Sequence, residues 1–276
     1  MSGIIITIVT VSFNSVSTIE QTICSVLNQT YGNIEYIVID GGSTDGTVKI
    51  LEKYSDRIRW ISESDDGIYD AMNKGIKMAT GDYIQFIGSD DCLINSHVIE
   101  NVVRMIDLNA DIVSAAEIVV EEDSKLEFLV GNERGHDFGP EQIPWIPHAS
   151  MLTRTSLLKG MPFDKRYKIA ADYDFILKCF KDENMKFQFL EMPIVYFSNG
   201  GVSNKQRAIA EAETEQIFRE LGYSVHKETM LSSGWRKCKV VIKLILKAIG
   251  LWTWIRCCFW GVTRHKCKND NCRWCD

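Results

Sequence analysis

The sequence predicts an α/β fold, in which a mainly parallel sheet carries helices on both faces and a C-terminal amphipathic helical tail follows. Short β-branched runs alternate with segments in which apolar side chains recur at helical spacing. This alternation is typical of βαβ units with right-handed crossovers. Polar clusters also follow directly after three of the predicted strands. In parallel sheets ligands bind at the carboxyl ends of strands, so these clusters indicate a binding site at one edge.

The predicted elements follow one another from the N-terminus. Residues 4–11 are almost wholly apolar, as in a strand that is buried on both faces. An amphipathic helix follows over residues 19–27, and Ser17 with Glu20 forms a capping-box pattern at its start. The remaining elements are strands at 34–39, 57–62 and 83–87, and helices at 48–54, 68–78 and 173–180, with a further helix that carries Val98, Val102 and Met105 and has Ser96 as its expected cap.

The chain is long enough for one large domain with an appendage. Its 276 residues are 45% hydrophobic, which allows a substantial core. From about Asp111 the alternation weakens and prolines become frequent. We therefore expect a domain over residues 1–225, divided into halves at 1–110 and 111–225, and a separate tail over residues 226–276.

Charge separates the tail from the rest of the chain. Residues 235–276 hold ten Lys and Arg against two acids, a net charge of +8 that leaves −14 for residues 1–234. The acidic body argues against a nucleic-acid partner. Residues 1–11 lack the basic start and cleavage site of a signal peptide, so we expect a cytoplasmic body.

The tail has the pattern of an interfacial membrane anchor. A helix over about 235–263 gathers basic residues on one face and apolar residues opposite, with several Trp and Phe beyond. Lys243, Lys247 and Arg256 interrupt the only stretch long enough to span a bilayer, so we expect surface binding to an anionic membrane, at the inner face of the cell membrane. The alternative is a helix that packs on the body.

The cysteines fall into two groups. Cys24, Cys92 and Cys179 occur singly in apolar patterns, where a thiol behaves as a small hydrophobe. In the tail, His265, Cys267, Cys272 and Cys275 form a possible set of zinc ligands. Their irregular spacing favours a tail without a structural zinc site.

Two strand-end motifs carry candidate chemistry. In residues 40–46, glycines allow close backbone approach and Asp40 can accept hydrogen bonds from a base edge. The alternative is a plain turn in which Asp45 caps the next helix. In residues 81–91, a buried strand runs into Asp90 and Asp91, which repel each other unless a cation or a helix start compensates them. Mg²⁺ is usually held by one or two carboxylates plus substrate phosphates, so a divalent ion with a diphosphate fits this position.

Four ordered segments together resemble the family 2 glycosyltransferases of the GT-A fold, a Rossmann-like architecture. They are residues 10–14, 40–47, 63–75 and 81–91, and the resemblance extends over roughly residues 4–200. The most similar members are bacterial enzymes of O-antigen, capsule and colanic-acid assembly. The resemblance implies a nucleotide-sugar-binding half at 1–110 and an acceptor-binding half at 111–225.

The resemblance also assigns residues to the nucleotide and the metal. It implies a pocket for a nucleotide with a uracil-like base, and it implies that Asp90 binds Mn²⁺ or Mg²⁺ with Asp91 as its support. Gly88 stands where the family usually has a first acid, which leaves the ribose contact open. The residues implied to form the nucleotide pocket are Thr10, Val11, Asn14, Asp40, Asp65 and Asn73.

On the acceptor side, residues 147–150 and 170–174 look like further family motifs, and they place His148 in the acceptor-binding half. The family's base is the aspartate of a Glu-Asp pair at a helix start. Ala171 takes the place of the glutamate here, so Asp172 is the candidate base and Asp174 the runner-up. An acid in a first helical turn is also stabilised by the helix dipole without any catalytic role, and a lone His beside Pro is as often structural as functional.

The implied activity is inverting, metal-assisted transfer of a hexose from a nucleotide sugar, expected to be a UDP-sugar. The acceptor is a polyprenyl-diphosphate-linked saccharide, as in lipopolysaccharide and exopolysaccharide biosynthesis. A nucleotidyltransferase shares such a sheet, but it normally has a basic Gly-rich phosphate loop after the first strand, and none follows Val11. A binding scaffold that has lost catalysis is the other alternative. The retained Asp40, Asp90, Asp91 and Asp172 argue against it.

Overall fold

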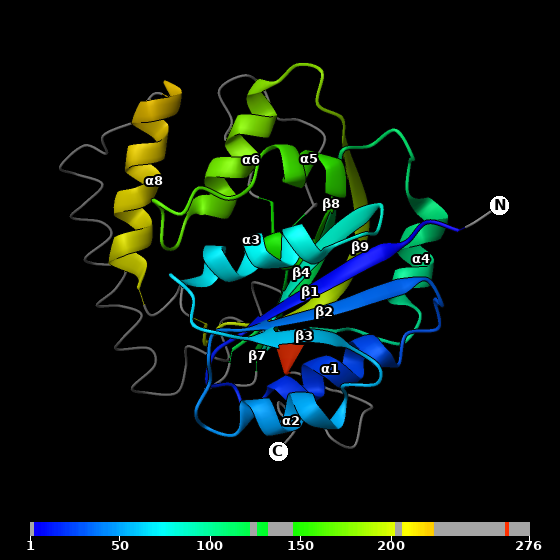
Figure 1. The fold of residues 1–276 in the computed structure, drawn as a ribbon. Coiled ribbons are helices and arrows are strands. Elements are labelled where there is room, and N and C mark those ends of the chain that lie inside the picture. Colours follow the sequence, from blue (N-terminus) through cyan, green and yellow to red (C-terminus); the bar gives the residue numbers. More distant parts are fainter. Residues whose placement is uncertain (1–2, 122–125, 132–145, 202–205, 224–262, 265–276) are drawn as a thin grey trace.

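A computed structural model describes residues 3–121, 126–131, 146–201, 206–223 and 263–264 of the chain (Figure 1). The predicted membrane-binding helix and the cysteines and histidine of the possible zinc set lie outside these residues. Within the part described, Cys24 is partly buried and Cys92 and Cys179 are buried. None of the helices in these ranges is long and apolar enough to cross a membrane.

Four parallel strands form the centre of the sheet, in the order β3-β2-β1-β4. Every residue of β1 is buried, as the apolar run at the N-terminus predicts. The bounds are β1 Ile6–Ser12, β2 Ile34–Asp40, β3 Arg59–Ser62 and β4 Tyr83–Gly88. The α/β fold with parallel central strands is therefore confirmed, although β3 begins two residues later than predicted.

The second half of the chain extends this sheet with mixed pairing. Next to β4 lies β8 (Met151–Arg154), antiparallel, and then β6 (Ile112–Val120) and β7 (Leu126–Val130), which continue antiparallel. In contrast, β9 (Phe187–Ser198) runs parallel to β6 and pairs with the short β5 (Cys92–Leu93). The two-residue β10 (Thr263–Arg264) pairs with β7. These strands replace the βαβ alternation that the sequence loses near Asp111.

Helices cover both faces of the sheet, as predicted (Figure 1). The alternation of β1 shows the division, because Ile6 and Ile8 join one core cluster and Val9 and Val11 join the other. On the first face lie α1 (Ile19–Leu27), α2 (Thr47–Lys53) and α4 (Val98–Met105), and on the second lie α3 (Ile68–Met78), α5 (Thr155–Gly160) and α6 (Ala171–Lys181), with α8 (Arg207–Leu221) beside α6.

Both predicted helix caps are wrong. The residue before α1 is Thr18 rather than Ser17, and its side chain makes no capping bond, while Glu20 accepts a hydrogen bond from Tyr54. Before α4 stands His97 rather than Ser96, and the N–H of Ile99 donates to the side chain of Gln29 at 3.1 Å. The sequence pattern predicts that nearby side chains cap these helix starts. In the structure, side chains from other elements make the hydrogen bonds instead.

We expect Gly75→Ala to destabilise the fold. A Cβ at Gly75 in α3 would lie 2.5 Å from Cγ1 of Val9 in β1, so the helix packs closer to the sheet than any other residue allows. Overpacking of this kind costs about 1–3 kcal/mol, more than the roughly 1 kcal/mol that Ala gains over Gly in a helix. Urea unfolding measures the change.

The matched control is Gly160→Ala, because a Cβ there meets nothing within 4 Å. Adding Val9→Ala to Gly75→Ala makes room for the methyl group and should recover part of the loss. A Gly75→Ala protein as stable as the parent would contradict the packing argument.

Candidate active site

The loops that follow the strands meet at the carboxyl edge of the sheet. Ser12 at the end of β1 donates to Asp40 at the end of β2, at 3.0 Å, and Ser62 at the end of β3 donates to the same carboxylate at 2.7 Å. The loop after β4 joins them through a 2.7 Å bond between the hydroxyls of Ser15 and Ser89. The prediction that these polar clusters lie together is confirmed.

Asp40 ties the loops together. Its carboxylate is fully buried and accepts five hydrogen bonds, from the hydroxyls of Ser12, Ser43 and Ser62 and from the N–H groups of Gly42 and Ser43. Burial raises the pKa of Asp40, but the bonds from Ser43 and Ser62 outweigh it and hold the pKa below its ordinary value. Asp40 thus stays charged. Its contact with the nucleobase of the donor stays a prediction, and such a contact would replace one of these five hydrogen bonds.

The loop after β1 is held in a strained conformation. Asn14 adopts a φ of 49°, and its side-chain oxygen accepts from the N–H of Thr44 at 3.0 Å. The hydroxyl of Thr10 lies 3.0 Å from that of Tyr36, and Val11 is buried in the second core cluster. Contact of their backbones with a nucleotide stays a prediction.

Gly41 lies between two candidate nucleotide contacts. A Cβ on Gly41 would be 2.6 Å from Oδ2 of Asp65 and 3.3 Å from the ring of Phe13. Phe13 is 64% exposed, unusual for a large aromatic ring. The sequence analysis did not single out Phe13, although its place between the end of a buried strand and Asn14 is a usable signal. Together the three residues present a carboxylate and an aromatic face side by side.

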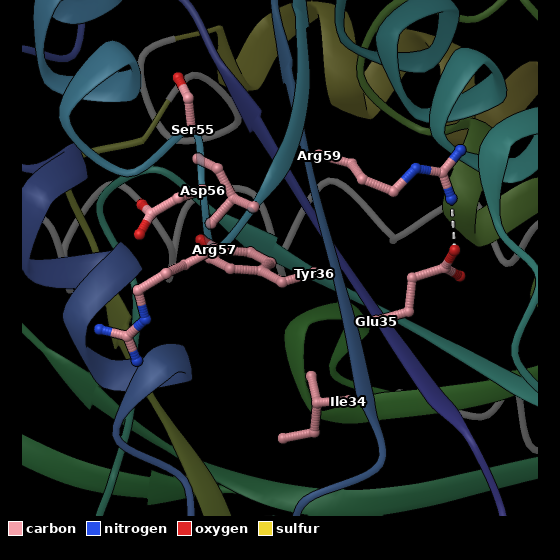
Figure 2. Close-up of a pocket in the computed structure, with 8 residues that line it drawn as sticks. Ile34, Glu35, Tyr36, Ser55, Asp56, Arg57 and Arg59 are labelled. Atoms are coloured by element: carbon pink, nitrogen blue, oxygen red, sulfur yellow. Dashed lines mark hydrogen bonds and ion pairs between the residues drawn. The ribbon is translucent and has the colours of Figure 1, made fainter.

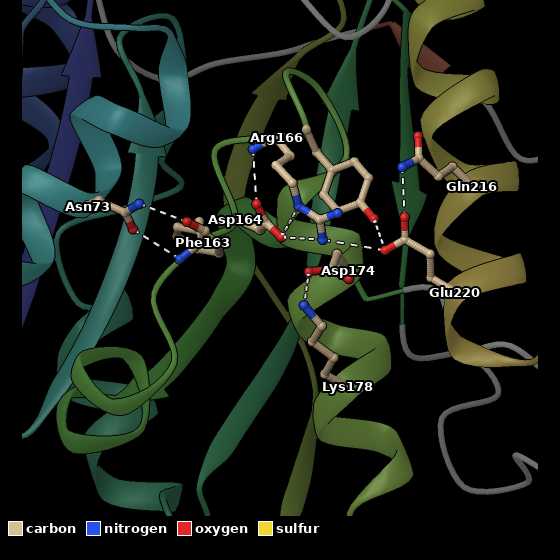
Figure 3. Close-up of polar contacts among 9 residues, drawn as sticks. Asn73, Phe163, Asp164, Arg166, Asp174, Lys178, Gln216 and Glu220 are labelled. Atoms are coloured by element: carbon tan, nitrogen blue, oxygen red, sulfur yellow. Dashed lines mark hydrogen bonds and ion pairs between the residues drawn. The ribbon is translucent and has the colours of Figure 1, made fainter.

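The side-chain amide of Asn73 pairs with the backbone of Phe163. Its side-chain nitrogen donates to the carbonyl of Phe163 at 2.8 Å, and its oxygen accepts from the N–H of the same residue at 3.0 Å (Figure 3). Both ends of the amide are therefore engaged by a backbone. Asn73 joins α3 to the acceptor-side half, and this pairing gives no support to a nucleotide contact.

Asp90 and Asp91 converge on Gly88. A Cβ at Gly88 would meet Oδ1 of Asp90 at 2.9 Å and Oδ2 of Asp91 at 2.8 Å, so a side chain at this position would require both carboxylates to move. Asp91 is buried and accepts from the N–H groups of Gly88 and Ser198. Burial, and then the charge of Asp90, raise the pKa of Asp91 well above its ordinary value.

This pair fits a divalent ion that shares its coordination with a diphosphate. Burial and the neighbouring charge of Asp90 both destabilise the charged form of Asp91, and a hard cation would offset both effects. Within the described ranges no group of three or more His, Cys, Asp or Glu side chains is arranged to hold a metal. Substrate oxygens are therefore needed to complete a site built on Asp90 and Asp91.

Glu117 in β6 is a further acid near this pair. It is buried, its charge contributes to the raised pKa of Asp91, and burial raises its own pKa to about 8. The sequence gives little sign of it, because a single acid inside an apolar strand resembles an exposed position.

The two candidate bases lie in different surroundings. Asp172, in the first turn of α6, is partly exposed and accepts from the hydroxyl of Tyr69 in the first turn of α3, at 2.6 Å. Since α3 follows β3, this contact brings Asp172 to the carboxyl edge of the sheet. Asp174 is buried and paired with Lys178 at 2.6 Å (Figure 3). Burial raises the pKa of Asp174, while Lys178 opposes the shift.

His148 lies in a ring of aromatic residues close to Asp172. It stacks on Phe86 of β4 at 5.4 Å between centroids and meets the edge of Phe163 at 5.6 Å. Burial lowers the pKa of His148, although the charge of Asp172 acts in the opposite direction, so the ring is neutral near pH 7. Its Nε2 is buried and has no hydrogen-bond partner in the described structure.

A hollow of about 360 Å³ lies elsewhere, at the amino ends of β2 and β3 (Figure 2). It is lined by residues 34–36 and 55–59, and an Arg59–Glu35 ion pair crosses one side. None of the candidate site residues borders it. The hollow is therefore separate from the strand-end loops.

Comparison with known proteins identifies the family. The model of glycosyl transferase family 2 matches residues 7–203, most of the chain, and the protein therefore belongs to this family and is a glycosyltransferase. A curated relative, the PGL/p-HBAD biosynthesis glycosyltransferase of Mycobacterium bovis (strain BCG / Pasteur 1173P2), is 26% identical over 215 residues, which are 74% of this chain and 81% of the relative.

Solved structures share the fold. The mannosyltransferase PcManGT of Pyrobaculum calidifontis, in complex with GDP-Man and Mn²⁺, matches 82% of this chain and 66% of its own with a TM-score of 0.62 at 15% identity. Residues 1–349 of S. aureus TarS, in complex with UDP-GlcNAc, match with 0.59 at 19% identity over 79% and 65%. In another S. aureus TarS structure, with a TM-score of 0.51, the match covers 42% of that chain. These likenesses confirm the GT-A type of α/β fold.

We expect Glu117→Gln to change how stability depends on pH. Glu117 has a pKa of about 8 in the folded chain, against about 4.3 in an unfolded one. Between these values the folded state keeps a proton that the unfolded state releases, so the free energy of unfolding falls as pH rises. The Gln variant should lose this decline and gain most, relative to the parent, near pH 8.

Urea unfolding at pH 5, 6, 7 and 8 measures the dependence in metal-free buffer. Glu191→Gln is the matched control, because Glu191 lies exposed on β9. Parallel profiles of the parent and the Glu117 variant would contradict the assignment of a buried, protonated Glu117.

Proposed function

We propose that this glycosyltransferase moves a sugar from a UDP-sugar to a lipid-linked saccharide, with inversion at the anomeric carbon. The observation that carries the proposal is the placement of Asp172. Its partly exposed carboxylate lies beside the first turn of α3, at the edge of the sheet where the loops after β1, β2 and β4 meet. A base beside a nucleotide-sugar site is what a single displacement requires.

The donor site is formed by the strand-end loops. The exposed ring of Phe13 offers a face for a base, and the backbones of Thr10 and Val11 with Asn14 and Asp65 supply polar contacts. Asp40 fixes the loop that carries Gly41. UDP as the nucleotide rests on the motif resemblance and on a fold neighbour with UDP-GlcNAc, while another neighbour binds GDP-Man.

Asp90 and Asp91 would hold Mn²⁺ or Mg²⁺ together with the donor diphosphate. The ion, when bound, neutralises charge that grows on the departing nucleoside diphosphate. The fold neighbour in complex with Mn²⁺ supports a divalent ion. Asp90 is proposed as the principal ligand on the motif resemblance, with Asp91, which accepts from two backbone N–H groups, as its support.

Asp172 is proposed to accept the proton that the acceptor hydroxyl loses. The acceptor hydroxyl loses its proton to the Asp172 carboxylate as its oxygen bonds to the anomeric carbon, and the nucleoside diphosphate leaves with the electron pair of the broken bond. Attack opposite the leaving group inverts the configuration. Asp174 is less suited because its carboxylate is buried against Lys178. His148, neutral and buried beside Asp172, is proposed to shape the acceptor side.

The acceptor is proposed to be a polyprenyl-diphosphate saccharide at the inner face of the cell membrane, in assembly of a surface polysaccharide. This proposal rests on the motif resemblance and on the basic, aromatic residues 226–276.

We expect Asp90→Ala to abolish transfer while the protein stays folded. A metal ion contributes several kcal/mol of charge stabilisation, so the rate should fall about 100-fold or more. The measurement is release of nucleoside diphosphate from a panel of UDP- and GDP-sugars with Mn²⁺ and a lipid-diphosphate acceptor. Asp56→Ala is the control, because Asp56 is exposed at the opposite end of β3.

Two results would contradict this proposal. EDTA-treated parent that works at full rate would exclude the metal role of Asp90. Parent protein that binds donors yet turns over none of the panel would favour the catalytically silent scaffold.

We expect the triple variant Lys239→Gln, Lys243→Gln and Lys247→Gln to bind anionic membranes more weakly. Each basic residue near an anionic surface contributes about 1 kcal/mol, so the loss should be roughly 100-fold in partitioning. Sedimentation with anionic liposomes measures it, and donor hydrolysis should remain unchanged. Lys49→Gln, Lys53→Gln and Lys77→Gln form the control, because all three are exposed on the body. If both triple variants lost liposome binding equally, or if the parent did not bind the liposomes, the proposed membrane anchor would be wrong.

A further inference from the structure

The turn at residues 168–170, directly before α6, is held by a carboxylate from another helix. Glu213 of α8 accepts from the N–H of Lys168 at 2.7 Å, of Ile169 at 2.9 Å and of Ala170 at 3.0 Å. Three backbone donors thus converge on one side chain that lies more than forty residues further along the chain. A charged acceptor makes such bonds stronger than neutral ones.

The opposite side of the same turn is held by α3. The hydroxyl of Tyr69 lies 2.7 Å from the carbonyl of Ile169 and 2.6 Å from Oδ1 of Asp172. One phenolic proton is shared between these two acceptors. Burial, then the charge of Asp172, raise the pKa of Tyr69 well above its ordinary value, so the hydroxyl remains a donor throughout the physiological range.

The start of α6 needs this support. The residue before the helix is Ala170, which makes no side-chain capping bond, and Ala171 stands where the family usually has a glutamate. The first N–H groups of a helix have no partner within it, so a carboxylate from outside stabilises the helix start. Glu213 supplies that negative charge immediately before the turn that carries Asp172.

We propose that Glu213 and Tyr69 are positioning residues for Asp172. Glu213 fixes the N–H side of the turn at residues 168–170, Tyr69 fixes its carbonyl side, and the Tyr69 hydroxyl orients the Asp172 carboxylate toward the acceptor. The inference rests on the proposed function, in which Asp172 is the base. Both residues would act through Asp172 and the turn that precedes it.

The two positions should respond differently. In Tyr69→Phe the charged form of Asp172 loses a hydrogen-bond donor, so the acid limb of the pH–rate profile should move to higher pH. In Glu213→Ala the turn loses its acceptor, and misplacement of a catalytic group by about 1 Å costs on the order of 100-fold in kcat. Glu213→Gln keeps the shape and one acceptor oxygen, so it should restore part of the rate.

The test measures kcat, the donor KM and the pH–rate profile for full-length parent and for Tyr69→Phe, Glu213→Ala, Glu213→Gln and Asp172→Asn. We expect kcat to fall about 10- to 100-fold in Tyr69→Phe and Glu213→Ala with donor KM within about twofold. The double variant Tyr69→Phe/Glu213→Ala should show a smaller fall in kcat than the product of the two single falls, because both residues act on one turn. Glu215→Gln is the control, since Glu215 lies exposed on α8 and pairs with Arg219.

The possible failures are distinguishable. If Asp172→Asn is inactive while Tyr69→Phe and Glu213→Ala keep the parent kcat and pH profile, the positioning role is wrong. The assignment of Asp172 as the base would then still stand. If kcat falls without a pH shift in Tyr69→Phe and without rescue by Glu213→Gln, the two residues are merely structural and the inference is overturned. If Asp172→Asn stays active, the proposed base itself is wrong.

Discussion

The buried carboxylate of Asp40 is the constraint on which the arrangement of the site depends. A charged group removed from water is costly unless hydrogen bonds compensate it. Here the compensation comes from the ends of three neighbouring strands, through Ser12, Ser62 and the turn at Ser43. Those bonds can form only if the three strand ends come together, so the charge enforces the geometry of the donor loops. Gly41 lies within the turn that Asp40 holds through the N–H groups of Gly42 and Ser43, and this places it against Asp65 and Phe13.

Local sequence predicts those features whose causes are local. The buried strand β1 and the helix α3, whose bounds Ile68–Met78 agree with the sequence, are encoded in apolar periodicity. Asp90 and Asp91 are recognisable because two adjacent acids after a buried strand conflict unless a cation or a helix start resolves them. In contrast, the predicted helix caps are wrong where a side chain distant in the sequence, such as Gln29 at the start of α4, accepts a hydrogen bond from a backbone N–H group.

The acceptor-side half depends on partners far apart in the chain, which no short pattern reveals. Tyr69 and Asp172 are 103 residues apart, and the amide of Asn73 is taken by a backbone 90 residues away. The antiparallel strands beyond β4 follow the same rule, because their pairing depends on contacts that no single segment encodes. A motif can therefore name Asp172, but only the three-dimensional arrangement shows which groups hold it.

Environment separates acids that the sequence presents as equivalent. Asp172 and Asp174 occupy the same helical turn, yet Lys178, four residues after Asp174, pairs with the Asp174 carboxylate. The Asp172 carboxylate instead accepts from the Tyr69 hydroxyl.

The electrostatic surroundings also determine what the donor site can bind. Burial, and then the charge of Asp90, raise the pKa of Asp91 where an anionic diphosphate is proposed to bind. A cation would offset the charges of these carboxylates and of the diphosphate, so donor and metal binding should be coupled. The body as a whole carries −14, which an anionic membrane repels, whereas residues 235–276 carry +8. The opposite signs favour an orientation in which the tail meets the lipid surface.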